Sequence, residues 1–164
     1  MDQDGHDVGG ARAAARLWIP MLAAYTCARI VELAAVRRED CLRDEDGWSI
    51  RLDGAQRAAR RKVPLHRTIV AAGFPAFVES RPPGLVFAED ESSIPRVAKS
   101  AMVGAKLGAR ELPERFLTAT YGADVSGNVT SAILGRPPDY HDRFGFGCPL
   151  AVMPEAIERL PEFV

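Results

Sequence analysis

A short stretch near the start of the chain, residues 25–33, constrains the local geometry more than any other part of the sequence. An apolar helical run is expected to end at Thr26-Cys27-Ala28, and Arg29 then opens a second short helix after a tight break. Further along, residues 61–66 (Arg-Lys-Val-Pro-Leu-His) have the pattern of a basic strand that stops at a turn. Two helices joined by a sharp turn and followed by a strand predict a fold that combines helices with a sheet.

The remaining pattern is mainly helical, with one β-hairpin in the N-terminal half of the chain. Helices are expected at residues 11–24, 29–36, 67–80, 94–107, 114–121, 125–134 and 149–160. Residues 48–52 alternate apolar and polar side chains, as a half-buried strand does, and residues 60–65 would form the returning strand. The expected class is therefore α+β, mainly α-helical, with a small β-hairpin sheet in the N-terminal half.

Local signals set the expected boundaries of these elements. Pro20 is expected to kink the first helix or make it restart, because proline lacks the N–H that a helix interior needs. Residues 37–47 are interpreted as a charged connection, and Asp53-Gly54 as a tight hairpin turn. Ser92 or Ser93 is expected to cap the helix that begins at residue 94.

The composition is that of an ordinary globular protein. Of the 164 residues, 47% are hydrophobic and 26% are charged, and 21 basic against 22 acidic residues give a formal net charge of −1. Proteins that bind nucleic acid usually carry a basic excess, although net charge says little about a local basic patch. Residues 1–10 are expected to form a flexible leader, and residues 11–164 a single domain with its own core.

Cysteine usage and hydropathy indicate the compartment. The three cysteines, Cys27, Cys41 and Cys148, are scattered, odd in number and without metal-ligand spacing. The longest apolar run, residues 17–28, is too short for a transmembrane helix. We therefore expect a reduced, cytoplasmic setting with no membrane partner, and the sequence predicts neither a metal site nor a cofactor.

Arg29 is the first candidate for chemistry. A guanidinium at the start of a helix can bind a phosphate through its planar fork of N–H donors. The alternative interpretation is a surface arginine, or an ion pair with Glu32 inside the same helix, because surface ion pairs are common and contribute little.

The densest run of basic residues comprises Arg57, Arg60, Arg61, Lys62 and Arg67. If residues 60–65 form a strand, Arg60 and Lys62 point to one face and Arg61 to the other. A hairpin with these side chains could lie along a nucleic-acid backbone. The alternative is a solvated edge strand whose charges prevent aggregation.

Two histidines lie outside the leader. His66 follows the end of a strand, where a lone histidine is more often a capping or structural residue than a catalyst. His141 lies beside Tyr140 and has the chemistry of an acid or base, but no pattern pairs it with a carboxylate or nucleophile. Serine-hydrolase, zinc and phosphate-loop signatures are absent.

Residues 26–33 (Thr-Cys-Ala-Arg-Ile-Val-Glu-Leu) resemble the first catalytic motif of tyrosine recombinases, the phage-integrase family, which has the form Thr-Gly-x-Arg-x-x-Glu-Leu. Residues 36–40 resemble the usual continuation of that motif, and residues 61–66 resemble the family's Arg-x-Val-Pro-Leu-His. The tail, residues 143–157, is similar to one integrase subgroup. The resemblance covers residues 16–160 and implies a fold like the catalytic domain of these enzymes, without their N-terminal core-binding domain.

The resemblance also implies a chemistry. In this family a tyrosine hydroxyl attacks a DNA phosphate, arginines stabilise the phosphate oxygens, and a lysine protonates the leaving hydroxyl. The candidate catalytic residues here are Arg29, Lys62, Arg115, Arg136 and Tyr140. The candidate DNA-binding residues are Arg29, Arg57, Arg60, Arg61, Lys62 and Arg67, with double-stranded DNA as the expected partner and a recombinase or a second copy of the chain as further candidates.

Several positions depart from the family pattern. The nucleophile aligns with Phe144, which has no hydroxyl, and Tyr121 and Tyr140 are poor substitutes by spacing. The second motif, His-x-x-Arg, falls near residues 110–113 (Arg-Glu-Leu-Pro), where neither group is in place. The hairpin lysine falls near residues 55–56, Ala-Gln. The resemblance therefore implies a degenerate catalytic domain that retains DNA binding.

Two other interpretations stay open. One is an active enzyme whose site residues are rearranged, which requires the five candidate catalytic side chains to converge on one phosphate-sized cleft. The other is a protein-interaction module that reuses the fold and binds no DNA, which an exposed apolar patch in place of a basic cleft would favour.

Overall fold

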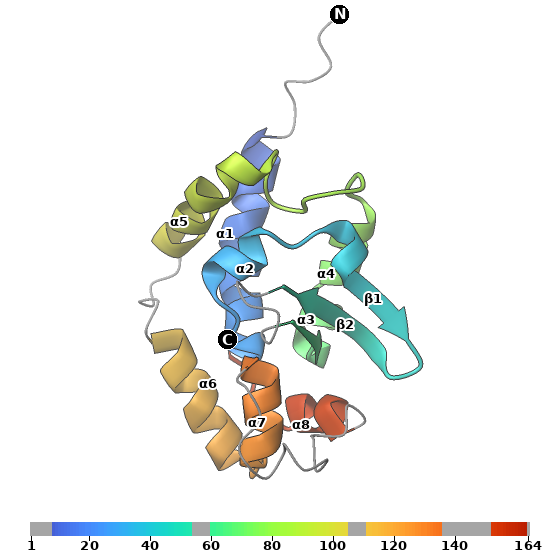
Figure 1. Ribbon diagram of the computed structural model, residues 1–164, viewed down its shortest axis with the longest axis vertical. Helices are drawn as coiled ribbons and strands as arrows, with labels where there is room; N and C mark the ends of the chain where they lie inside the picture. Colours follow the sequence, from blue (N-terminus) through green and yellow to red (C-terminus); the bar gives the residue numbers. More distant parts are fainter. Residues whose placement is uncertain (1–7, 54–59, 105–110, 136–151, 164) are drawn as a thin grey trace, which may run out of the picture.

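In the computed structural model, which describes residues 8–53, 60–104, 111–135 and 152–163, a small antiparallel sheet lies beside a larger set of helices (Figure 1). The helices are α1 (Val8–Thr26), α2 (Ile30–Ala34), α3 (Arg67–Ala71), α4 (Phe74–Glu79), α5 (Ile94–Gly104), α6 (Glu111–Gly122), α7 (Gly127–Leu134) and α8 (Met153–Glu158). The strands are β1 (Cys41–Asp44), β2 (Gly47–Leu52) and β3 (Arg61–Pro64), and two short 3-10 helices are η1 (Arg38–Asp40) and η3 (Glu91–Ser93). The expected class, mainly helical with a small sheet in the N-terminal half, is confirmed.

Helix α1 is the long apolar helix against which α2, α5 and α6 pack. It continues through Pro20, so the expected restart at this residue is wrong. Ile19 and Leu22, on either side of the proline, are completely buried. Burial of these side chains offsets the hydrogen bond that proline cannot donate, and the helix therefore persists.

The sheet has three strands in the order β1-β2-β3, one more than the predicted hairpin. The paired residues Ile50 and Val63, from β2 and β3, are both fully buried, whereas the end of β1 is exposed. The interpretation of residues 37–47 as a simple charged connection is therefore wrong. An exposed edge strand carries no alternating apolar pattern, and its charges are the usual protection of a sheet edge.

The connection between β2 and β3 is longer than predicted. Leu52 pairs with Arg61, so residues 53–60 link the two strands and Asp53-Gly54 cannot be a two-residue hairpin turn. Residues 54–59 lie outside the described part of the chain.

The single helix predicted over residues 67–80 is two helices, α3 and α4. Gly73 separates them with a φ of 94°, a left-handed conformation that glycine adopts without strain. The break lets Ile69 of α3 and Phe74 of α4 both reach the core at 0% exposure.

Other helix boundaries follow from capping. Ser92 and Ser93 belong to η3, which runs directly into α5, and Asp90 is the N-cap of η3, because its Oδ1 accepts a hydrogen bond from the Ser93 N–H at 2.8 Å. Ser126 caps α7 in the same way, and Gly135 ends that helix with a φ of 65°. Helix α6 begins at Glu111, three residues before the predicted start, and α8 is shorter than predicted.

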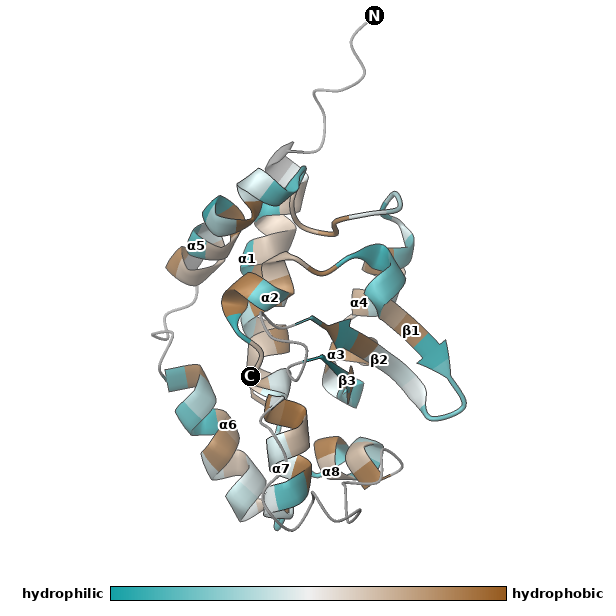
Figure 2. Ribbon diagram, in the orientation of Figure 1, coloured by the Kyte–Doolittle hydropathy of each residue, from teal (hydrophilic) through white to brown (hydrophobic). Residues whose placement is uncertain are grey.

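One hydrophobic core joins the sheet to the helices. It includes Leu22, Leu33, Ile50, Ile69 and Phe116, which come from α1, α2, β2, α3 and α6 and are all fully buried. Hydrophilic residues gather at the tip of the sheet between β1 and β2 (Figure 2). Within the described residues, no helix is both long and apolar enough to cross a membrane.

Candidate nucleic-acid interface at the junction of α1 and α2

The turn between α1 and α2 is held by its own side chains. The Thr26 hydroxyl donates to the carbonyl of Leu22 at 2.8 Å and accepts a hydrogen bond from the Ala28 N–H at 3.2 Å. Cys27 adopts a positive φ of 49°, which costs a residue with a Cβ about 1–2 kcal/mol. Glycine adopts this conformation without strain, so Cys27 stands at a position that favours glycine. This turn fixes the direction in which Arg29 leaves the backbone.

Arg29 is the N-cap residue of α2 and is tied to Glu32. The Arg29 N–H donates to Oε2 of Glu32 at 3.0 Å, and the guanidinium Nη2 lies 3.3 Å from Oε1. The Arg29 side chain is nevertheless 66% exposed, whereas that of Glu32 is 5% exposed. The structure therefore agrees with the alternative interpretation, in which Arg29 lies at the surface and pairs with Glu32, and phosphate binding by its exposed guanidinium stays a prediction.

Glu32 also binds Arg61, which comes from β3. The Arg61 Nη2 lies 3.1 Å from Oε2 of Glu32, and its Nε donates to the carbonyl of Ile133 in α7 at 2.7 Å. The Arg61 side chain is 6% exposed. This arginine therefore ties α2, β3 and α7 together inside the molecule, and it presents little surface to a ligand.

A hollow of about 430 Å3 opens beside Arg29 between α1, α2, α5 and α6. Its walls are mainly apolar and include Ala28, Ile30, Val31, Met102, Leu112 and Pro113. Within the described residues, Arg29 and Lys99 are its charged lining residues. Leu112 and Pro113 make the part of the wall that α6 contributes apolar.

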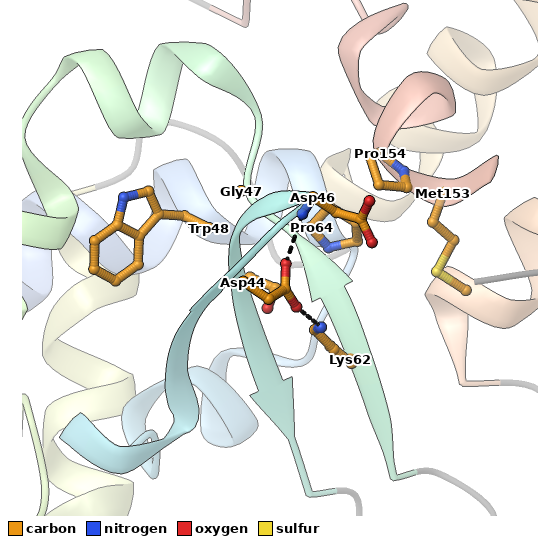
Figure 3. A pocket seen from close by; sticks show the side chains of 9 residues that line it. Asp44, Asp46, Gly47, Trp48, Lys62, Pro64, Met153 and Pro154 are labelled. Atoms are coloured by element: carbon orange, nitrogen blue, oxygen red, sulfur yellow. Dashed lines mark hydrogen bonds and ion pairs between the residues drawn. The ribbon is translucent and has the colours of Figure 1, made fainter. Parts of the chain in front are cut away.

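Three of the basic residues on and after the hairpin are also in ion pairs. Arg60 binds Asp53 at 3.0 Å, and Lys62 binds Asp44 at the end of β1 (Figure 3). Arg67 binds Glu158 of α8 at 2.9 Å and donates its backbone N–H to the same carboxylate. The predicted alternation is confirmed, because Lys62 is half-exposed and the neighbouring Arg61 points inward.

The structure separates Lys62 from Arg29. Lys62 lines a small cavity of about 40 Å3 at the tip of the sheet with Asp44, Met153 and Pro154, as Figure 3 shows, and Arg29 does not line it. The Lys62 ammonium binds Asp44, which lowers the pKa of that carboxyl, first through the hydrogen bond from Lys62. Lys62 and Arg29 thus belong to different hollows.

The other candidate residues fall into two groups. Arg115 is exposed on α6 and does not line the hollow beside Arg29, and neither does Tyr121, which is 89% exposed at the end of the same helix. Arg57, Arg136, Tyr140 and Phe144 lie outside the described residues.

His66 is a structural residue, as predicted. It is the N-cap of α3, where its Nδ1 accepts a hydrogen bond from the Thr68 N–H at 3.2 Å, and its ring stacks on Tyr25 with centroids 4.4 Å apart. Burial lowers the pKa of His66, and Arg67 adds to this effect. A buried neutral histidine stacked in the core contributes to stability and is not available to a substrate.

The sequence did not indicate that Lys99 belongs to this site, and it did not indicate the full role of Glu32. Lys99 lies on α5, far from Arg29 in the sequence, and joins it only because α5 packs on α1 and α2. Glu32 was considered as a partner of Arg29, but nothing in the sequence indicates that it also neutralises Arg61. Within the described residues, no His, Cys, Asp and Glu side chains gather as metal ligands do.

No family model and no curated protein matches this sequence. The fold does match a solved structure, the integrase from mycobacterium phage Brujita, with a TM-score of 0.59 and 19% sequence identity. The match covers 94% of this chain and 53% of the other, so this chain spans about half the length of that integrase. The expectation of an integrase-like fold, which began from residues 26–33 and 61–66, is therefore confirmed at the level of the fold.

Proposed function

We propose that this protein binds duplex DNA through phosphate contacts at Arg29 and acts in DNA recombination or integration without cleaving the strand. The observation that carries the proposal is the exposed guanidinium of Arg29, held at a strained turn by the buried Glu32. A guanidinium fixed in this way loses little side-chain freedom when it binds a phosphate, which favours binding. The integrase-like fold supports the choice of DNA as the partner.

The proposed absence of cleavage is supported by the described residues around Arg29. Transfer of a phosphoryl group requires cationic donors on more than one side of the phosphate, because charge develops on its oxygens in the transition state. Among the described residues, Lys99 is the other cation that lines the hollow; Leu112 and Pro113 contribute no donor from α6, and Arg115 does not line it. Phe144 at the nucleophile position of the family carries no hydroxyl.

The proposed binding is weak and strongly dependent on salt. Arg60, Lys62 and Arg67, like Arg29, already have carboxylate partners, so each must give up or share an ion pair before it contacts a phosphate. With one or two phosphates neutralised, the logarithm of the binding constant should fall with the logarithm of the salt concentration with a slope of about −1 to −2.

The test is fluorescence anisotropy of a labelled generic duplex across a salt series. Arg29→Ala should weaken binding about tenfold at low salt and reduce the slope by about one. Arg12→Ala is the matched control, because it removes the same charge from an exposed position near the start of α1. Equal losses in the two variants, or no binding by the wild type at the lowest salt, would overturn the assignment of the phosphate site to Arg29.

The claim that the strand is not cleaved needs a separate assay. The protein is incubated with a nicked duplex that traps covalent intermediates, and the products are resolved under denaturing conditions. No protein–DNA adduct is expected. An adduct that disappears in Tyr140→Phe or in Tyr121→Phe would disprove this half of the proposal and support the rearranged-enzyme interpretation.

A further inference from the structure

The hollow beside Arg29 has more apolar wall than a phosphate can use. Its volume of about 430 Å3 falls within the range of about 300–1,000 Å3 that is typical of ligand pockets. Sugar and phosphate groups gain nothing from contact with Ile30, Met102 and Leu112, and they lose water there. Binding of a DNA phosphate to Arg29 therefore leaves the apolar interior of the hollow unexplained.

An exposed apolar stripe continues from the hollow along α6. Pro113, Leu117 and Tyr121 follow one another at intervals of four residues, so they lie on one side of the helix, and all three are exposed. Pro113 also lines the hollow. The core contacts of α6 come from other residues, Leu112 and Phe116, so the folding of this helix does not require the stripe. These three residues are called the α6 stripe.

Both charged side chains that line the hollow within the described part of the chain are cationic. Arg29 is highly exposed and shares a single carboxylate with Arg61, and Lys99 is exposed on α5. Within the described residues no acidic side chain lines the hollow. The ligand that matches this hollow best therefore combines apolar side chains with carboxylates. Its apolar side chains would contact the apolar walls, and its carboxylates would pair with Arg29 and Lys99.

We propose that the hollow and the α6 stripe bind an acidic, amphipathic segment of another protein, with its apolar side chains in the hollow and along the stripe and its carboxylates against Arg29 and Lys99. This site goes beyond the proposed DNA binding and does not depend on it. Since both ligands would use Arg29, the segment and the duplex exclude one another.

The probe is a synthetic amphipathic peptide with leucine at helical spacing and glutamate elsewhere. Two matched peptides separate the contributions: one carries lysine in place of glutamate, and the other serine in place of leucine. The readout is the methyl resonance of Met102, which lines the hollow, in protein labelled with carbon-13 at the methionine methyl groups. Met153, buried in α8, serves as an internal reference. The glutamate–leucine peptide should shift Met102 and leave Met153 unchanged, and both matched peptides should bind at least about tenfold more weakly.

Variants separate this site from the DNA site. Val31→Ser and Leu117→Ser change exposed residues, so the fold should be retained, and each should weaken the peptide by about fivefold or more. Leu117 does not line the hollow beside Arg29, so Leu117→Ser should also leave duplex affinity unchanged. Arg29→Ala should weaken both ligands. The proposal is overturned if Met102 does not respond to the glutamate–leucine peptide, if the lysine peptide binds equally well, or if Val31→Ser and Leu117→Ser leave peptide binding intact. None of these results bears on the proposed DNA binding, which the duplex titration tests separately.

Discussion

The carboxylate of Glu32 lies 3.1 Å from the guanidinium of Arg61, and both side chains are almost completely withdrawn from water, with exposures of 5% and 6%. The same carboxylate also holds the backbone N–H and the exposed guanidinium of Arg29. One acidic residue therefore neutralises the cation that ties the sheet to α2 and positions the cation that faces solvent. The stability of the fold and the geometry of the proposed site depend on the same carboxylate.

Replacement of this carboxylate by an amide, Glu32→Gln, should destabilise the protein by about 3–5 kcal/mol, because the buried Arg61 loses the carboxylate with which it forms an ion pair. The measurement is the free energy of unfolding from urea denaturation. Glu91→Gln is the matched control, since it breaks the exposed Arg37–Glu91 pair and should cost less than about 1 kcal/mol. Similar losses in the two variants would mean that the buried pair contributes no more than a surface one.

The positive φ of Cys27 predicts that Cys27→Gly stabilises the protein. Relief of the left-handed strain exceeds the entropy that glycine loses on folding, for a net gain of about 0.5–1 kcal/mol. The change should appear as a higher thermal midpoint. Cys27→Ala keeps the strained backbone and removes the thiol, so it should give no gain. A gain of equal size in the alanine variant would assign the effect to the thiol instead.

The buried ring of His66 predicts a dependence of stability on pH. The folded state holds the pKa below its ordinary value of 6.5, chiefly through burial, while the carboxylates of Glu158 and Glu162 and the Leu160 carbonyl oppose the shift and Arg67 favours it. The unfolded chain therefore binds the proton more readily. The stabilisation is present above pH 6.5 and is lost as the pH falls toward the lower pKa of the folded state.

The measurement is the free energy of unfolding between about pH 7.5 and 5.5 for the wild type and for His66→Asn. Asparagine keeps an oxygen that can cap α3 but does not titrate. We expect the free energy of unfolding to change less with pH in His66→Asn than in the wild type, whatever the absolute stability of the variant. Parallel slopes in the two proteins would show that another group causes the loss.

Burial, with a further contribution from Asp40, raises the pKa of the Cys41 thiol to about 12. In a variant in which Cys27 and Cys148 are replaced by alanine, Cys41 should react with a thiol reagent at mildly alkaline pH at least about a hundredfold more slowly when folded than in denaturant. The rate of labelling at the two conditions measures this difference. Comparable rates would mean that the thiolate forms readily in the folded protein.

The Lys62–Asp44 ion pair predicts a gain of DNA affinity, on the premise that the proposed function is correct. Asp44→Asn frees the Lys62 ammonium from its carboxylate, and one additional phosphate contact should raise duplex affinity about threefold to tenfold at low salt. Anisotropy titrations of the single variant and of Asp44→Asn combined with Lys62→Ala test the explanation. If the double variant keeps the gain, the loss of negative charge alone is responsible.

Much of the fold follows from local signals. The break at Thr26-Cys27-Ala28, the strands β2 and β3, the stop at Gly135 and the capping role of His66 all depend on short-range preferences that a sequence displays directly. Arg29 was identified in the same way, because it opens a helix directly after this break.

Other features depend on contacts between distant parts of the chain. The exposed edge strand β1 forms because β2 offers it a partner, and α1 continues through Pro20 because the surrounding core buries its neighbours. The break at Gly73 lets α3 and α4 approach the core from separate directions.

The candidate site also combines features set by local sequence with features set by contacts between distant residues. Local chemistry predicts an arginine that can bind phosphate. The character of its surroundings arises because α5 packs on α1 and α2 and α6 packs on α1, which brings Lys99, Met102 and Pro113 to one hollow. Ion pairs between residues far apart, such as Arg61–Glu32 and Arg67–Glu158, likewise decide which basic side chains remain for a ligand. A charge is a property of a residue, whereas its availability is a property of packing, and packing is settled only when the whole chain has folded.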